Sequence, residues 1–309
     1  MEKRLHAKEN RRRHPAGDTV DYPFLILVLL LLAVGLTMLY SASSAQSQYD
    51  TGYAISTRYL QKQGVCAAVG LCAMYAFSRI PVRLWYRLAW GMYGVSIVLL
   101  LLVLAAGQEV NGARRWITIA GIQFQPSEVA KFTMIVLFAR LTRRFGQDAK
   151  KIRFGVLGFG AALLGILVPL ALEKHLSAIL LMGMVAVVMM YVAGTNPKWL
   201  LAGAGAAAVF VVIYISFMGY AGDRVTAWLH PEADPGDTGY QILQSLYAIG
   251  SGGVFGRGFG KSRQKYLYLP FQYNDYIFAI CCEELGLLGA LAIIALFAAM
   301  IFRGYWIAL

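Results

Sequence analysis

Residues Trp228–Asp275 read WLHPEADPGDTGYQILQSLYAIGSGGVFGRGFGKSRQKYLYLPFQYND, the longest polar interval inside a chain that is otherwise a series of apolar runs. Seven apolar runs precede this stretch and one follows it. It brings acidic, basic, glycine and aromatic residues together. This combination predicts that the chemistry of the protein lies here.

The apolar runs predict membrane spans. Of the 309 residues, 59% are hydrophobic and 14% are charged, whereas soluble domains carry about 25% charged residues. Spanning segments need roughly 20 apolar residues, and lipid requires their backbone groups to be paired within the segment. We therefore predict an all-α polytopic membrane protein with eight transmembrane helices. The predicted spans are Tyr22–Ser41, Gly64–Phe77, Leu88–Ala106, Val129–Leu141, Phe154–Leu172, Leu176–Val192, Trp199–Met218 and Tyr276–Phe302.

The charge distribution predicts the orientation of the spans. With the N-terminus in the cytoplasm, most of the 28 Lys and Arg residues fall on the cytoplasmic side, as the positive-inside rule requires. Residues 1–20 then form a basic cytoplasmic tail, and 21–309 the transmembrane domain. A large extracytoplasmic loop, residues 219–275, joins the seventh and eighth helices. The net charge of +12 is thus attributed to topology and anionic lipid, and no nucleic-acid partner is expected.

The cysteines and the glycine-rich run exclude several kinds of site. Cys66, Cys72, Cys281 and Cys282 lie in apolar runs without metal-ligand spacing, so we expect buried thiols. No strand precedes the glycines of residues 252–260, so a dinucleotide fingerprint is excluded. Glycines let backbone N–H groups approach a ligand closely. With the cations that follow them, they predict a site for an anionic or phosphate-bearing ligand; the alternative is a flexible surface loop with solvated bases.

A second polar segment precedes the fourth span. Residues 125–128, Gln-Pro-Ser-Glu, predict a helix start, with Pro and an acid in the first turn. Glu128 and Lys131 then lie three residues apart on one helix face and can pair. They either neutralise each other near the interface or line a polar site, since charges within spans usually face a cavity or a partner.

Two further groups of charged residues raise the same question. Glu283 and Glu284 lie within the last span, and Glu173, Lys174 and His175 lie in the turn between the fifth and sixth spans. A lone histidine is weak support for catalysis, and a satisfied interfacial histidine is an equal alternative.

Four motifs resemble a known family. NGARRWI, FQPSEVAK, DPGDTGYQILQSLYAIGSGGVFGRGFGKSRQKYLYLP and NDYIFAICCEELGLLGA, in this order, are similar to the SEDS family of bacterial envelope proteins, which comprises FtsW, RodA and SpoVE. The resemblance runs from about Leu39 to Ala290. The segments GYQILQSLYAIGSGG and QKYLYLP are most like the FtsW/SpoVE branch.

The resemblance implies a function, a location and partners. It implies a peptidoglycan glycosyltransferase in the bacterial cytoplasmic membrane that polymerises lipid II on the outer face, for cell division or sporulation. It also implies a class B penicillin-binding protein and other divisome membrane proteins as partners. Asp234, followed by Pro235, matches the family's catalytic acid. The substrate-binding candidates are Glu128, Lys131, Arg114, Arg115, Gln125, Ser127, Gln264 and Lys265.

The reaction assigns roles to these residues. The acceptor hydroxyl is a poor nucleophile and needs a general base. Glu232, Asp234 and Asp237 compete, and Pro235 restrains only Asp234, by favouring an extended backbone before it. Lys131, Arg114 and Arg115, or a divalent cation, would neutralise the pyrophosphate leaving group; no other cofactor and no metal site are evident.

Two departures from the family pattern remain. A Pro-Asp-Leu-Gly-Thr-like stretch is replaced by EKHLSA at residues 173–178, so no role is assigned to His175. The family normally has ten spans, so we expect the chain to lack two helices. A lipid-linked oligosaccharide flippase and a non-catalytic divisome scaffold stay open as alternatives.

Overall fold

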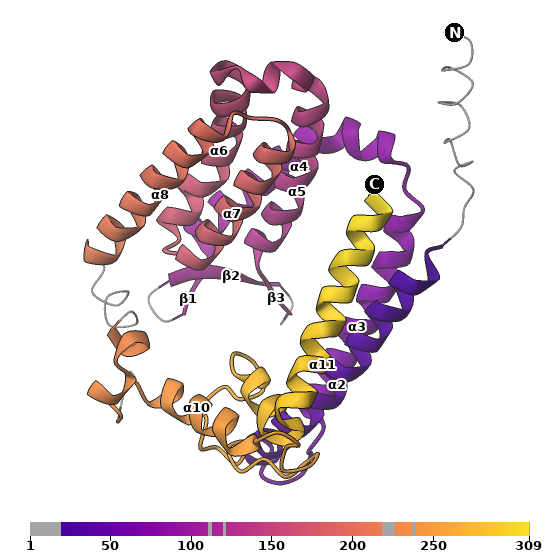
Figure 1. Cartoon of the computed structure of the whole chain (residues 1–309), viewed down its shortest axis with the longest axis vertical. Coiled ribbons are helices and arrows are strands. Elements are labelled where there is room, and N and C mark those ends of the chain that lie inside the picture. The colour runs from indigo at the N-terminus through magenta and orange to yellow at the C-terminus, as the bar shows by residue number, and fades with distance from the viewer. Residues whose placement is uncertain (1–19, 111–112, 120–121, 218–225, 237–238, 309) are drawn as a thin grey trace. The chain divides into compact units, whose positions relative to one another are not determined.

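The computed structural model describes residues 20–110, 113–119, 122–217, 226–236 and 239–308, and it is mostly helical (Figure 1). The chain divides into two compact units. The first unit comprises Met1–Ala73 and Gly219–Leu309, and the second comprises Met74–Met218. Each unit is described by itself below.

Eight long helical segments lie at the eight predicted spans. Among the described residues, four of them are long and apolar enough to cross a membrane: α2, α4, α11 and the stretch Arg153–Leu172. In that stretch a π-helical turn, η3, continues into α6. The segments are α2 (Tyr22–Asp50), α3 (Arg58–Ser78), α4 (Val82–Ala106), α5 (Pro126–Phe145), η3 (Arg153–Gly158) with α6 (Phe159–Leu172), α7 (Leu176–Val192), α8 (Pro197–Phe217) and α11 (Ile277–Ala308).

The second unit is a helical bundle around an apolar core. Phe138 of α5 and Phe159 of α6 are fully buried, with ring centroids 5.0 Å apart. The hydroxyl of Tyr93 on α4 donates to the carbonyl of Ala162 on α6 at 2.7 Å. Ser96 of α4 and Thr133 of α5, both buried, share a hydrogen bond of 2.9 Å. Apolar packing and a few satisfied polar contacts therefore hold the bundle together. A short 3-10 helix, η2 (Gly146–Lys150), follows α5.

A small antiparallel sheet at one end of this bundle departs from the all-α prediction (Figure 1). Strand β2 (Ala113–Ile119) lies between β1 (Gln108–Val110) and β3 (Ile122–Phe124). Its segment Trp116–Ile119 is rich in aromatic and β-branched residues, which favour strands. The all-α prediction was therefore wrong for this region. Residues 111–112 lie outside the described residues.

In the first unit, α2 and α11 run side by side in opposite directions (Figure 1). Asp21 caps the start of α2 by accepting from the N–H of Phe24 at 2.8 Å. The same carboxylate accepts from Arg303, near the end of α11, at 2.6 Å. At the opposite end of the pair, the Ser41 hydroxyl of α2 donates to Glu284 of α11 at 2.7 Å. Polar contacts thus fix the register of the two helices at both ends.

The polar interval between α8 and α11 is largely structured. It contains η4 (Pro231–Ala233) and α10 (Tyr240–Gly252), followed by tight turns as far as Tyr276. Leu269 and Gln272 within these turns are fully buried, and Leu269 packs in a small core with Ala248 of α10 and Ile280 of α11. Residues 240–276 therefore form a folded cap on α11.

The cysteines divide into two pairs. Cys281 and Cys282 are buried, as predicted. Cys66 and Cys72 are exposed, contrary to the prediction, because α3 buries none of its residues within the chain. All four are free thiols.

Candidate functional site

Helix α11 is interrupted at Gly286, where φ is +70°. In an unbroken helix, the carbonyls of Glu283 and Glu284 would accept from the N–H groups four residues later. Here those two bonds are missing. Residues 253–258, which we call the spliced segment, accept from the N–H groups of Leu287 and Leu288 and donate to the carbonyls of Glu283 and Glu284. The four replacement bonds run from Leu287 N–H to the Gly253 carbonyl (2.9 Å), from Leu288 N–H to the Val254 carbonyl (3.2 Å), from Arg257 N–H to the Glu283 carbonyl (3.0 Å) and from Gly258 N–H to the Glu284 carbonyl (3.0 Å).

Two glycines permit this close approach of backbones. A Cβ atom at Gly256, where φ is +78°, would lie 2.2 Å from the Glu284 carbonyl oxygen. A Cβ atom at Gly286 would lie 2.2 Å from the nitrogen of Gly256. Backbone groups cannot yield at such distances, and positive φ is costly for other residues. The glycine-rich run is therefore needed for packing against α11.

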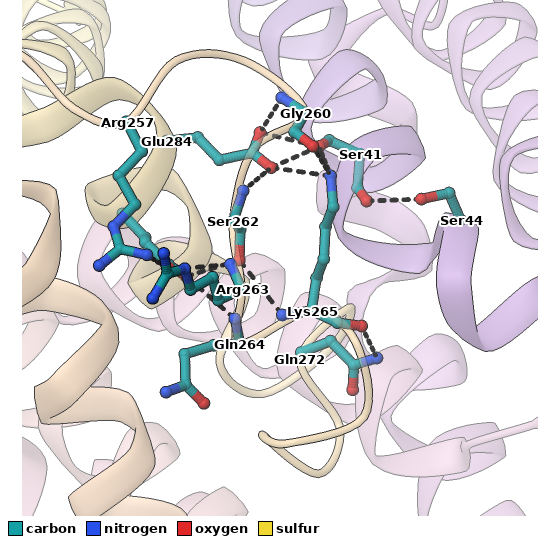
Figure 2. Close-up of polar contacts among 11 residues, drawn as sticks. Ser41, Ser44, Arg257, Gly260, Ser262, Arg263, Gln264, Lys265, Gln272 and Glu284 are labelled. Carbon is teal, nitrogen blue, oxygen red and sulfur yellow. Dashed lines mark hydrogen bonds and ion pairs between the residues drawn. The ribbon is translucent and has the colours of Figure 1, made fainter.

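The carboxylates of Glu283 and Glu284 are 1% and 0% exposed and accept a series of hydrogen bonds, many of them drawn in Figure 2. Backbone N–H groups of four residues after the spliced segment donate to them. These bonds join Gly260 to Glu284 (3.0 Å), Ser262 to Glu284 (3.2 Å), Arg263 to Glu283 (2.9 Å) and Gln264 to Glu283 (3.3 Å). The N–H of Gly260, one of the glycines predicted to approach an anionic ligand, therefore binds the chain's own carboxylate. Binding of an external anion by the cations that follow the glycines stays a prediction.

The charge of these carboxylates is balanced by two cations. Lys265, only 3% exposed, places Nζ 3.1 Å from Glu284. The same ammonium donates to the carbonyl of Gly260 at 2.6 Å and to the Ser41 hydroxyl of α2 at 3.2 Å. Arg257 approaches Glu283 at 3.6 Å. The geometry therefore gives Lys265, a predicted substrate contact, a structural role. We refer to Ser41, Arg257, Ser262, Lys265, Glu283 and Glu284 as the carboxylate cluster.

Asp234, the predicted general base, is exposed at the end of η4. Its φ of −140° and ψ of 75° lie outside the helical region, as Pro235 predicts. Its carbonyl accepts from the N–H of Gly239 at 3.0 Å. A Cβ atom at Gly239 would lie 2.1 Å from the Pro231 carbonyl oxygen, so only glycine fits where these two backbones approach each other.

The two competing acids are placed differently. Glu232 is exposed, 3.6 Å from the Nδ1 atom of His230. Asp237 lies outside the described residues.

In the second unit, the substrate-binding candidates on β2 and α5 lie near the turn between α6 and α7. Arg115 of β2 donates to the carbonyl of Lys174 in that turn at 2.7 Å. Glu128 and Lys131 form the predicted ion pair at 2.7 Å. Helix α5 begins at Pro126 after Gln125, as predicted. Arg114 is exposed on the same strand.

Four buried polar atoms on these elements have no partner among the described residues. Among the described residues, Arg115 Nε, Ser127 Oγ, Glu173 Oε1 and His175 Nδ1 are buried and make no hydrogen bond. Buried unpaired groups are costly and usually have a functional or solvent partner. We call Arg115, Ser127, Glu128, Lys131, Glu173 and His175 the Arg115 cluster.

Burial sets the charge states in the turn of the Arg115 cluster. Burial raises the pKa of Glu173 to about 7, and the Arg115 guanidinium opposes the shift. Burial, aided by Arg115, lowers the pKa of His175 to about 4, so this histidine is neutral at physiological pH. The available signal in the sequence was an acid and a histidine in one tight turn, a pattern to which no role was assigned.

Asp234 and the carboxylate cluster belong to the first unit, and the Arg115 cluster belongs to the second. Within the described part of the chain, no three His, Cys, Asp or Glu side chains group closely enough to hold a metal ion.

Comparison with known proteins gives consistent results. The family model for the FtsW/RodA/SpoVE cell cycle proteins matches residues 22–309. A Geobacter sulfurreducens protein named "Probable peptidoglycan glycosyltransferase FtsW" is 38% identical over 297 residues, covering 92% of this chain and 77% of that protein. A Mycobacterium tuberculosis protein of the same name is 37% identical over 263 residues, covering 84% and 50% respectively.

Solved structures agree. A chain from a structure described as "Structural coordination of polymerization and crosslinking by a peptidoglycan synthase complex" is similar with a TM-score of 0.70 and 28% identity, over 92% of this chain and 76% of that chain. The Thermus thermophilus rod shape determining protein RodA, at 24% identity and a TM-score of 0.64 over 94% of this chain and 75% of that chain, shares the fold. The predicted resemblance is confirmed: this chain belongs to the FtsW/RodA/SpoVE family of integral membrane proteins.

Proposed function

We propose that the protein is a peptidoglycan glycosyltransferase that polymerises lipid II into β-1,4 glycan strands. The observation that carries the proposal is the 38% identity, over 92% of the chain, to a relative named for this activity. The matching region includes both units described above.

In this proposal Asp234 is the general base. It takes the proton from the acceptor hydroxyl while that oxygen attacks the anomeric carbon of the donor and the bond to undecaprenyl pyrophosphate breaks. An exposed carboxylate on a backbone fixed by Gly239 suits this role, because a base must be held within hydrogen-bond reach of its proton. Direct displacement inverts the α-linked donor to a β-linked product.

The Arg115 cluster is the proposed site of the pyrophosphate. Lys131 and Arg115 supply positive charge where the leaving group becomes more negative. The Lys131 side chain is 28% exposed beside a Glu128 side chain that is 58% exposed, so a ligand can reach the ammonium. A divalent cation bound to the pyrophosphate would add to this stabilisation.

The proposed topology follows the charge distribution. All eight segments span the membrane, the N-terminus is cytoplasmic, and the interval between α8 and α11 faces the outside. A class B penicillin-binding protein is the proposed partner. Support comes from the similar chain, at 28% identity, in a structure described by polymerization and crosslinking in one complex.

One experiment separates this function from the two alternatives. The full chain, with its penicillin-binding protein, is reconstituted into vesicles that carry labelled lipid II in the outer leaflet only. Long glycan chains are expected for the glycosyltransferase. Movement of lipid II between leaflets without polymer would indicate a flippase, and neither product would leave a scaffold.

A further inference from the structure

The start of α4 and the end of α5 carry a group of arginines that the proposed mechanism does not use. The sheet β1–β3 connects the end of α4 to the start of α5. The start of α4 and the end of α5 therefore lie together at the opposite end of the bundle in the second unit. Exposed cations gather on the segments at this end: Arg79, Arg83, Arg87, Arg143, Arg144, Lys150, Lys151 and Arg153.

Negative charge is scarce at this end of the bundle. Asp148 is the only acid within residues 75–90 and 136–155, and it pairs with Lys151 at 2.7 Å. The first turn of α4 contains no acid, although the N-terminus of a helix favours negative charge. Among the described residues, none of the arginines at this end forms an ion pair. Their positive charge is therefore available to an anion from outside the chain.

Two of the arginines converge on the ring of Tyr86. The guanidinium carbon of Arg140 lies 4.7 Å from the ring centroid, and that of Arg143 lies 5.3 Å from it. Arg140 is held in place, because its Nη1 atom donates to the backbone carbonyls of Tyr86 at 2.7 Å and of Arg87 at 3.3 Å. We call Tyr86, Arg87, Arg140 and Arg143 the Tyr86 cluster. Two like charges held around one ring repel each other, so a bound anion would stabilise the arrangement.

The Tyr86 cluster lies at the level where two predicted spans meet the membrane surface. The apolar run of α4 begins at Leu88, and that of α5 ends at Leu141. Trp90 of α4 is exposed, and tryptophan and tyrosine are enriched where hydrocarbon meets the headgroups. An anion at this level is a lipid phosphate. The proposed topology assigns this end to the cytoplasmic leaflet, whose anionic lipids attract basic segments.

We propose that the Tyr86 cluster binds the phosphodiester of an anionic glycerophospholipid. Arg87 and Arg143 donate to the phosphate oxygens, since the planar guanidinium fork matches phosphate geometry. Arg140 adds a positive charge fixed by the backbone. The acyl chains lie against exposed apolar side chains of α4, such as Leu88 and Trp90. This site goes beyond the proposed activity and uses neither Asp234 nor the Arg115 cluster.

Lipid binding to the full chain in detergent tests the site. Native mass spectrometry gives dissociation constants for dioleoyl phosphatidylglycerol and for dioleoyl phosphatidylcholine, which has the same acyl chains but no net charge. The wild-type protein should prefer phosphatidylglycerol by at least about tenfold, the value of one charge-assisted hydrogen bond. Glycerophosphoglycerol, which lacks the acyl chains, and a glutamate-rich decapeptide should both compete poorly, because a lipid also buries apolar chains against α4.

Variants assign the preference to the Tyr86 cluster. Arg87→Gln and Arg143→Gln should each weaken phosphatidylglycerol binding by about fivefold, the usual value of one arginine near an anionic lipid surface. Phosphatidylcholine binding and the melting temperature should stay at wild-type values, which shows that the variants are folded. Arg144→Gln and Lys150→Gln are matched controls, because they remove the same charge from exposed neighbours that do not contact the Tyr86 ring.

The outcomes separate a defined site from a general attraction of basic segments to membranes. Equal affinities of the wild-type protein for the two lipids would overturn the site, as would equal losses in Arg143→Gln and Arg144→Gln. Tighter binding of the decapeptide than of phosphatidylglycerol would assign the surface to an acidic protein segment and would also overturn it. None of these results depends on polymerisation of lipid II, so the inference and the proposed function fail separately.

Discussion

The backbone carbonyl of Glu283 accepts from the N–H of Arg257 at 3.0 Å, in the place that Leu287 would fill in an unbroken helix. This relationship makes the spliced segment and α11 one folding unit. It also explains how a broken helix is tolerated close to a membrane, where every freed backbone group needs a partner. The side chains of Glu283 and Glu284 then accept hydrogen bonds from the turns of residues 260–264.

The first prediction concerns the glycines of the splice. Gly256→Ala should lower the thermal unfolding midpoint sharply and expose the Leu287 and Leu288 amides to hydrogen exchange, because its Cβ would strike the Glu284 carbonyl. The left-handed backbone alone costs about 1–2 kcal/mol for alanine. Gly250→Ala is the control, since its Cβ meets nothing within 4 Å. Equal unfolding midpoints and equal amide exchange in the two variants would contradict the described packing of the spliced segment against α11.

The second prediction concerns the buried ion pair. Glu284→Gln leaves Lys265 buried without its counter-charge, which typically costs about 3–5 kcal/mol. The double variant Glu284→Gln/Lys265→Met should recover part of this loss, as measured by thermal melting in detergent. Glu128→Gln removes an exposed pair and should cost at most about 1 kcal/mol. A Glu284→Gln protein as stable as Glu128→Gln would refute the structural role of the carboxylate cluster.

The third prediction concerns pH. The pKa of Glu173 is raised to about 7, so its stabilising contribution is full below about 4.5 and is lost as pH rises through 7. The pKa of His175 is lowered to about 4, so its contribution is present above about 6.5 and is lost as pH falls through 4. The two dependences oppose each other between pH 4.5 and 6.5.

Single variants should separate these opposing contributions. Relative to wild type, the melting temperature of Glu173→Gln should rise as pH increases from 4.5 to 7. That of His175→Asn should fall as pH increases from 4 to 6.5. Differential scanning fluorimetry across this range provides the measurement, and parallel curves for all three proteins would show that neither group titrates as described.

The helices were predictable from the sequence, because each depends on local composition. Long apolar runs located all eight segments, and Pro126 marked the start of α5. The pairing of Glu128 with Lys131 followed from helical spacing alone. By contrast, the short strands of the sheet, such as β1 (Gln108–Val110), carry too few residues for a clear alternating pattern.

The tertiary contacts could not be predicted in the same way. The glycine-rich run predicted a site for an anionic ligand. In the structure, N–H groups at and after the end of this run bind the carboxylates of Glu283 and Glu284, some twenty residues later in the chain. No local sequence pattern indicates that residues 253–258 replace hydrogen bonds within α11. Likewise, Arg115 meets Lys174 only because β2 packs at the end of the bundle.

Polymerisation of lipid II by the reconstituted full chain, with its penicillin-binding protein, tests the central claim most directly. Asp234→Asn keeps the shape of the side chain but removes the base, so the rate should fall by about 100-fold or more. Glu232→Gln, two residues away and equally exposed, is the matched control and should polymerise at a rate close to wild type. Full polymerisation by Asp234→Asn, or an equal loss in Glu232→Gln, would contradict the account.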